Sequence, residues 1–281
     1  MTTNQAVRVV TDSTADLTQS IVDELGITVV PLNVHFGDEV YKEGVEITNA
    51  QFYQKLQASA KLPTTSQPTV GDFASAYRAL MPASVVSIHV AEKLSGTYNS
   101  ARLAAESVTE TRIAVIDSQS TTIGLAWSVI YAAKAAKAGA SFEEVVAVVK
   151  ETMGRVRLVA ALETLEYLRR GGRIGPASAF LGSLLSIKPL IYVQDGEVRP
   201  LEKVRTQAKA MQRLVEIVSQ TAPYDDLAVA HAQRPEAAEE VRRALSAIHP
   251  YDRILLTEIG CVVGTHAGPG TIGVAGTRKN I

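Results

Sequence analysis

Four hydroxyl-rich segments of the sequence carry the residue types best suited to binding an anion. We expect them at the carboxyl ends of parallel strands, an edge of the sheet where ligands bind. Hydroxyl groups and the free N–H groups at a helix start can donate hydrogen bonds to an anion there. The alternative is that these Ser, Thr and Asp side chains only cap helices. The segments are Thr11–Thr14, Thr64–Gln67, Ser95–Thr97 and Asp117–Ser120.

The turn at Ser95 is the sharpest of these segments. It follows an apolar run, contains Gly96 and precedes a helical pattern. Because glycine has no side chain, the backbone N–H groups of this turn can come close to a bound anion. Ser95 and Gly96 are therefore candidate ligand-binding residues.

A glycine-dense segment near the end of the chain, Gly264–Gly273, contains a further polar group, His266. The segment includes a formal G-x-G-x-x-G pattern, but we reject a dinucleotide site. Only eight residues follow Gly273, too few for the helix and the acidic residue that such a site requires. We expect a tight turn before a final strand. Whether His266 faces a ligand from that turn is left open by the local sequence.

Signatures of catalysis are almost absent. The sequence has no G-x-x-x-x-G-K-[ST] loop, no H-E-x-x-H and no G-x-S-x-G. The five histidines lack metal-ligand spacing, so we expect no metal site. The single cysteine, Cys261, lies in an apolar run and is expected in the core. Asp12 follows the first strand as an aspartyl nucleophile would, but the next acid, Asp16, is too distant in sequence for two closely spaced metal carboxylates.

Three arginines surround the glycine pair Gly171-Gly172, and two interpretations of them are open. They form either a solvated helix end, where cations interact favourably with the helix dipole, or an anion clamp that docks a ligand or partner. The arginines are Arg169, Arg170 and Arg173.

The composition excludes several classes of protein. Hydrophobic residues make up 46% of the 281 and charged residues 20%, so the chain is not mostly disordered. The net charge of −1 argues against wrapping nucleic acid or coating an anionic membrane. No apolar run approaches the roughly 20 residues of a membrane span. With one cysteine and no signal-peptide pattern, we expect a soluble, cytoplasmic protein without a transmembrane segment.

The first half of the chain alternates short apolar strands with helices. This order predicts a parallel sheet covered on both faces. Capping patterns at Thr48, Thr69 and Ser141 mark three helix starts. The segment Lys61–Pro68 is expected to be a loop. The predicted strands are Val7–Val10, Ile27–Val34, Ser84–Val90 and Arg112–Ile116, and the longest predicted helices are Tyr98–Val108 and Thr122–Ala138.

The second half has a different pattern. Asp195-Gly196 separates two strand-like runs and predicts a hairpin, and Pro176 is expected to open a helix. Hairpin and crossover units together predict a second α/β domain with a mixed or antiparallel sheet. We place the domains at residues 1–154 and 155–281. The predicted strands are Val156–Leu162, Pro189–Gln194, Glu197–Val204, Leu227–His231 and Arg253–Ile259.

Taken together, these motifs resemble the DegV family of fatty-acid-binding proteins (FakB-type) over essentially the whole chain. Each motif alone is short, whereas their order and spacing are specific. The motifs are Val9–Thr14 (VVTDST), Thr65–Pro68 (TSQP), Leu94–Tyr98 (LSGTY), Val115–Ser118 (VIDS), Arg170–Ile174 (RGGRI) and Gly264–Gly270 (GTHAGPG).

The resemblance implies that the two α/β domains hold a long-chain fatty acid between them. The first domain would carry the carboxylate-binding turns, and the second would complete an apolar tunnel for the acyl chain. Thr65 and Ser95 would bind the carboxylate, helped by the N–H of Gly96, and His266 would belong to the same polar network. Neighbouring threonines in these motifs are secondary candidates, namely Thr64, Thr97 and Thr265.

The resemblance also implies a partner. In relatives of this type a separate fatty acid kinase supplies ATP and makes the acyl phosphate, a step in phospholipid metabolism. This chain would then be a lipid-binding subunit without a cofactor, and not an enzyme. Arg170 and Arg173 would face the kinase or its phosphates. We expect no nucleic-acid partner and, at most, transient membrane contact.

The site residues implied by the resemblance are neutral. Neutral donors on Thr65, Ser95 and His266 would pair a buried carboxylate while leaving its oxygens nucleophilic, and a Lys or Arg clamped on it would weaken the nucleophile. Two other hypotheses stay open. One is a stand-alone phosphotransferase or hydrolase that uses Asp12 or His266 on a small phosphate ester. The other is a carrier of another amphipathic anion.

Overall fold

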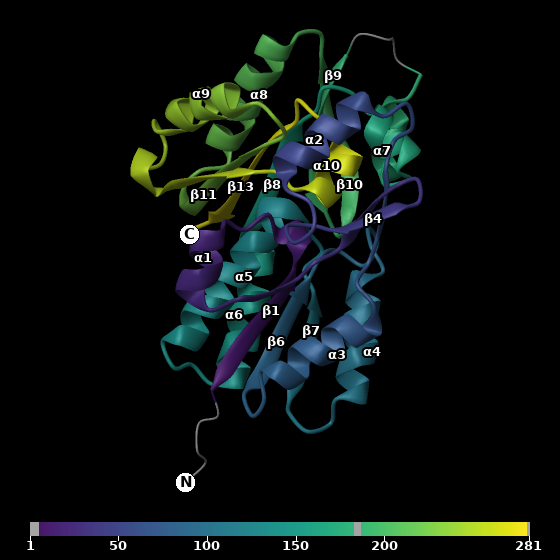
Figure 1. Cartoon of the computed structure of the whole chain (residues 1–281). Coiled ribbons are helices and arrows are strands. Elements are labelled where there is room, and N and C mark those ends of the chain that lie inside the picture. The colour runs from purple at the N-terminus through teal and green to yellow at the C-terminus, as the bar shows by residue number, and fades with distance from the viewer. Residues whose placement is uncertain (1–5, 183–186, 280–281) are drawn as a thin grey trace.

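The computed structural model describes residues 6–182 and 187–279, and its first half forms a parallel sheet (Figure 1). The strand order is β2-β1-β6-β7, and the strands are short runs rich in Val and Ile, which favour extended backbone. Their polar carboxyl ends lie at one edge, as predicted. The bounds are β1 Val7–Asp12, β2 Thr28–Val30, β6 Ser84–His89 and β7 Ile113–Asp117.

Helices cover both faces of this sheet because apolar side chains point to both sides of its strands. Two helices pack on one face around the buried rings of Phe73 and Tyr77. Two others pack on the opposite face, together with α1 (Gln19–Leu25). The first pair is α3 (Val70–Ala79) and α4 (Thr97–Ser107), and the second pair is α5 (Thr122–Lys137) and α6 (Phe142–Arg155).

The second half forms a six-stranded mixed sheet in the order β10-β9-β8-β13-β11-β12, in which only β11 and β12 run parallel. The α/β fold with a parallel first sheet and a mixed second sheet is therefore confirmed. The bounds are β8 Val156–Ala161, β9 Lys188–Gln194, β10 Glu197–Val204, β11 Tyr224–His231, β12 Ile254–Glu258 and β13 Ile272–Arg278.

The helix α5 lies between the two sheets. One face of the mixed sheet is covered by α8 (Gln207–Gln220) and α9 (Pro235–Leu245). Its other face packs against α5, α2 (Asn49–Ala58) and α10 (Cys261–Ala267). Since α5 also packs on the parallel sheet, the two cores share one helix. The boundary between residues 154 and 155 therefore stays a prediction. None of the described helices is long and apolar enough to cross a membrane.

Local sequence signals are confirmed where they are strongest. Thr48, Thr69 and Ser141 each form a capping box at the start of a helix. The hairpin turn has φ of 53° at Asp195 and 74° at Gly196, the left-handed pair that a tight two-residue turn requires. The helix predicted at Pro176 is a 3₁₀ helix over Gly175–Phe180.

Two predictions for the first half are wrong. The run Ile27–Val34 is not one strand, because it divides into β2 and then β3 (Asn33–Phe36) in another sheet. Pro31, which has no N–H to donate to a ladder, lies at the break. The expected loop Lys61–Pro68 contains β5 (Thr64–Ser66). A small antiparallel sheet, β4-β3-β5, results, with β4 at Glu39–Lys42.

The terminal glycine segment also differs from its prediction. Gly264 and His266 lie in the helix α10, and only the residues from Gly268 onward turn into the final strand β13. A helix was missed because glycine is a poor helix former. Gly264 is favoured here by close packing, since a Cβ at this position would lie 2.6 Å from the hydroxyl oxygen of Tyr53. The predicted final strand is confirmed.

Candidate functional site

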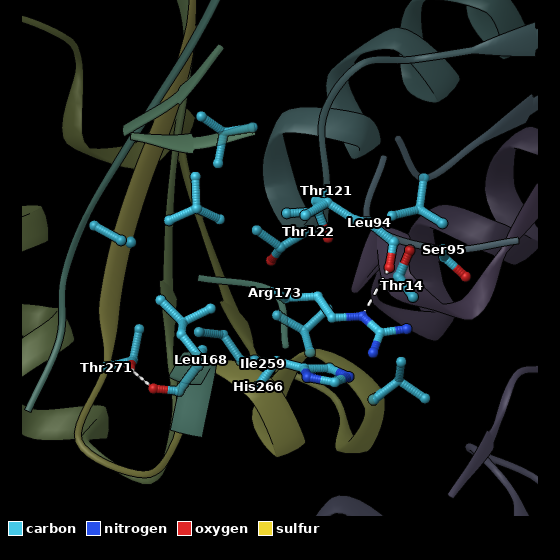
Figure 2. Close-up of a pocket in the computed structure, with 18 of the residues that line it drawn as sticks. Thr14, Leu94, Ser95, Thr121, Thr122, Leu168, Arg173, Ile259, His266 and Thr271 are labelled. Carbon is cyan, nitrogen blue, oxygen red and sulfur yellow. Dashed lines mark hydrogen bonds between the residues drawn. The ribbon is translucent and has the colours of Figure 1, made fainter. Parts of the chain in front are cut away.

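An apolar cavity lies between the parallel sheet and the mixed sheet (Figure 2). The volume accessible to the centre of a water molecule is about 120 Å³. Because one water needs only about 10–15 Å³ on this measure, the cavity has room for much more than a single water. Most of the wall is aliphatic and comes from strands β8 and β9, from helix α10 and from residues that flank these elements. These residues include Leu158, Leu162, Ile191, Val193, Ile259 and Val262.

Polar side chains gather at one end of the cavity. Figure 2 shows Ser95 and Thr14 at this end, with the guanidinium of Arg173 pointing toward them and the imidazole of His266 beside it. Thr65, Ser66 and Gln67 of the small sheet also line the cavity. The first and second halves of the chain therefore both supply the polar groups.

His266 and Thr65 form a direct pair at this end. Nε2 of His266 lies 2.9 Å from Oγ1 of Thr65, although the two residues are 201 positions apart in sequence. Burial, and secondly the charge of Arg173, lowers the pKa of His266 to about 4. The imidazole is therefore neutral at physiological pH. Its Nδ1 is buried and has no hydrogen-bond partner in the described part of the chain.

Ser95 sits in the turn between β6 and α4, as the sequence predicted. Its Oγ accepts a hydrogen bond from the backbone N–H of Thr97 at 3.3 Å and lies 2.8 Å from Thr97 Oγ1. Ser95 lines the cavity. Thr97 is fully buried. Gly96, the N-cap of α4, lies against the side chain of Gln67. Neither Thr97 nor Gly96 lines the cavity wall. Their sequence-predicted ligand roles stay predictions.

The remaining threonine candidates lie away from the cavity. Thr64 is exposed on β5 and is not part of the cavity wall. Thr265 is buried in α10, where its hydroxyl donates to the carbonyl oxygen of Cys261 at 2.9 Å. Its hydroxyl is therefore used within the helix itself.

The two arginines of the predicted patch have different environments. Arg173 lines the cavity, where Nε donates to the carbonyl oxygen of Leu94 at 3.0 Å and Nη1 to that of Gly171 at 2.8 Å. No carboxylate lies within ion-pair distance of it among residues 6–182 and 187–279. Arg170 is exposed and donates to Glu166 at 2.5 Å. Arg173 therefore adds a cation to the cavity wall, beside the neutral residues that the resemblance implies.

Sequence reasoning did not single out the individual threonines Thr14 and Thr122, which also line the cavity. Both hydroxyls are already committed as donors: Thr14 donates to Asp12 at 2.5 Å, and Thr122 to Asp16 at 2.5 Å. Thr14 belongs to the first hydroxyl-rich segment, whereas Thr122 has no signal beyond its place at a helix start.

Asp12 is a structural residue and is placed unlike a nucleophile. It is fully buried, and its two oxygens lie within hydrogen-bond distance of Thr14, the backbone N–H of Val90 and the ring of His89. A carboxylate that is so completely bonded and enclosed cannot reach a phosphate ester. The hypothesis of a hydrolase that uses Asp12 therefore loses its geometric basis.

Two other buried carboxyls attach α10 to the first half of the chain. Asp16 accepts the N–H of Gly260 at 2.9 Å, and Glu43 accepts that of Val262 at 2.8 Å. Burial is the main cause that raises the pKa of both carboxyls, and for Asp16 the charge of Glu43 raises it further. Among the described residues, no group of three His, Cys, Asp or Glu is placed to hold a metal ion.

Comparisons with known proteins identify the family. Residues 6–279 match the family model described as "Uncharacterised protein, DegV family". A DegV domain-containing protein of Caldanaerobacter subterraneus is 36% identical over 275 residues, which cover 96% of this chain and 98% of that protein.

Solved structures extend the likeness to the fold. A DegV family protein from Thermus thermophilus, described by its fatty acid binding, has a TM-score of 0.90 and 35% identity, covering 98% of this chain and 100% of that one. A stearic acid-binding protein from Eubacterium ventriosum has a TM-score of 0.89 and 28% identity, covering 97% and 98%. The sequence match over nearly the whole length, together with the shared fold, shows that this chain belongs to the DegV family.

Proposed function

We propose that this protein binds a long-chain fatty acid in the cavity between its two sheets, with the carboxylate at the polar end. The observation that carries the proposal is the convergence of Thr65, Ser95, His266 and Arg173 at one end of an otherwise aliphatic cavity. The fatty acid binding described for similar solved structures supports the same ligand class.

Hydrogen-bond directions at the polar end favour an anion. Thr65 accepts a bond from the neutral His266 ring when Nε2 carries the proton, and its own hydroxyl proton is then available. Ser95 accepts the N–H of Thr97 and in the same way keeps a proton to donate. These two hydroxyls, together with Arg173, can pair a carboxylate that would be costly to bury alone.

The acyl chain supplies affinity and the polar end supplies orientation. Each methylene removed from water contributes about 0.8 kcal/mol, so an alkyl chain of ordinary length binds tightly in an aliphatic cavity. A small polar phosphate ester would leave the same aliphatic walls without a partner. The geometry therefore favours an amphipathic anion over a small hydrolase substrate.

We further propose that the bound fatty acid is presented to a separate fatty acid kinase, in a cytoplasmic step of phospholipid metabolism. The absence of a phosphate-binding loop from the sequence supports an external source of ATP. Arg173 lowers the nucleophilicity of a carboxylate that it contacts, but it also offsets the repulsion between that carboxylate and an incoming phosphate. Because these two effects of Arg173 oppose each other, the carboxylate can still accept a phosphoryl group once a partner supplies the nucleotide.

Native mass spectrometry of the purified protein, followed by lipid extraction, tests the ligand. We expect one long-chain fatty acid per chain, exchangeable with added oleate or palmitate. Protein that is empty and takes up neither acid would overturn the proposal, and recovery of an acyl ester or polar lipid instead would identify another amphipathic anion.

The kinase step is tested by adding ATP and a fatty acid kinase to the loaded protein. Acyl phosphate is expected only when all three are present. Turnover of a small phosphate ester by the isolated chain would favour a stand-alone enzyme.

A further inference from the structure

The residue after α7 (Glu166–Arg170) packs unusually closely against α10. A Cβ atom built on Gly171 would lie 2.2 Å from Nδ1 of His266 and 2.9 Å from Cε1 of the same ring. Real Cβ atoms essentially never approach another heavy atom closer than 3.0 Å. The imidazole therefore lies directly on the Cα of Gly171, in space that any other amino acid would fill.

Backbone conformation does not explain why glycine is found at this position. The φ of Gly171 is −74°, a value that alanine adopts without strain. Its neighbour Gly172 has a φ of 70° and open space where a Cβ would be, so that glycine serves the turn of the chain. The requirement at Gly171 is therefore for the absence of a side chain.

Gly171 also contacts Arg173, the charged residue of the polar end. Its carbonyl oxygen accepts Nη1 of Arg173 at 2.8 Å, and its N–H donates to the carbonyl oxygen of Tyr167 at 2.9 Å. The backbone of Gly171 thus accepts a hydrogen bond from the Arg173 guanidinium, and its Cα packs against the His266 imidazole.

We infer that Gly171 is a positioning residue, whose missing side chain lets the His266 ring lie where Nε2 reaches Thr65 while its carbonyl holds Arg173. With any side chain at position 171, the ring must rotate or shift away, and the Thr65 hydroxyl loses its partner. The effect on fatty acid affinity rests on the function proposed above. The effect on the ring itself does not.

The ring is tested in ligand-free protein by a ¹⁵N-imidazole NMR titration of wild type and Gly171→Ala. In wild type we expect neutral His266 with the proton on Nε2 and a pKa of about 4. In the variant we expect a solvated ring whose pKa returns toward its ordinary value of about 6.5. An unchanged tautomer and pKa would overturn the inference. The control is Gly154→Ala, since Gly154 has open space around its Cα and an exposed position.

Affinity for oleate is tested in a double-mutant cycle with His266→Ala. Gly171→Ala is expected to weaken oleate binding about tenfold in wild type, the size of one lost neutral hydrogen bond. In the His266→Ala background, where no ring is displaced, we expect less than a twofold effect. Equal losses in both backgrounds would overturn the inference.

Folding is covered by the same set of variants. If Gly171→Ala alone does not fold, recovery of folded protein in the double variant supports the steric origin, and equal failure contradicts it. If wild type binds no oleate, the proposed function fails, while the NMR result still decides the role of Gly171.

Discussion

Replacing Thr65 by valine removes one hydroxyl from the polar end and leaves a side chain of nearly the same size. That hydroxyl lies 2.9 Å from Nε2 of His266 and is proposed to donate to the fatty acid carboxylate. The change therefore removes two hydrogen bonds at once, with little change in volume at position 65.

The expected loss of affinity follows from both bonds. A hydrogen bond to a charged group is worth about 1.5–3 kcal/mol. In the free variant, water in the cavity can replace Thr65 as a partner of His266, but the bound acyl chain displaces that water. The ring then stays unsatisfied in the complex, which costs about 1–3 kcal/mol. The sum is roughly 3 kcal/mol or more, a loss of about a hundredfold in affinity.

Ser95→Ala serves as the matched comparison. Thr97 Oγ1 lies 2.8 Å from Ser95 Oγ, so a water molecule in the space left by the serine hydroxyl can bridge Thr97 and the ligand. We therefore expect a loss of only about 1 kcal/mol, or roughly fivefold.

Displacement of a fluorescent fatty acid measures both variants, and thermal unfolding checks that each is folded. The reasoning is refuted if Thr65→Val binds within threefold of wild type. It is also refuted if Ser95→Ala loses more affinity than Thr65→Val.

Three further predictions follow from the polar end and the buried carboxyls. Arg173→Gln should weaken fatty acid binding about tenfold through loss of a charge-assisted bond, and unchanged calorimetric affinity would contradict this. Because folding raises the pKa of Asp16 and Glu43, their contribution to stability is full below about pH 4 and is lost as pH rises through their folded-state values. Urea unfolding should therefore show that the free energy of unfolding of wild type falls, relative to that of the double variant Asp16→Asn/Glu43→Gln, as pH rises. A difference between the two proteins that does not change with pH would contradict this prediction. Asp12→Asn should lower the free energy of unfolding by about 2–4 kcal/mol, because it disrupts the hydrogen bonds of Asp12 to Thr14, His89 and Val90. A calorimetric melting temperature equal to that of wild type would show that this network is dispensable.

Most helices and strands could be predicted because their signals are local. A capping box or a two-residue hairpin turn involves residues within four positions of one another. The division of Ile27–Val34 was missed because which sheet a strand joins depends on distant partners. Thr65 on β5, for example, pairs in register with Val34 on β3.

The site could be predicted only in part, for the same reason. The family resemblance identified Thr65, Ser95 and His266, but their spacing alone does not bring Thr65 to His266. Arg170 and Arg173 are three positions apart and similar in sequence context, yet the positive φ of Gly172 turns the chain between them. One arginine is therefore exposed and the other lines the cavity, a difference that the pattern RGGRI does not encode.

The single tryptophan gives this fold a built-in optical reporter. Trp127 lies on α5, the helix shared by both cores, and its indole N–H donates to the carbonyl oxygen of Ala275 on β13 at 3.1 Å. The fluorescence of Trp127 therefore reports on the contact between the two halves of the chain without any introduced label. A blue-shifted, quencher-resistant signal marks docked halves, and a red shift that precedes the loss of helical circular dichroism would reveal their separation before either half melts.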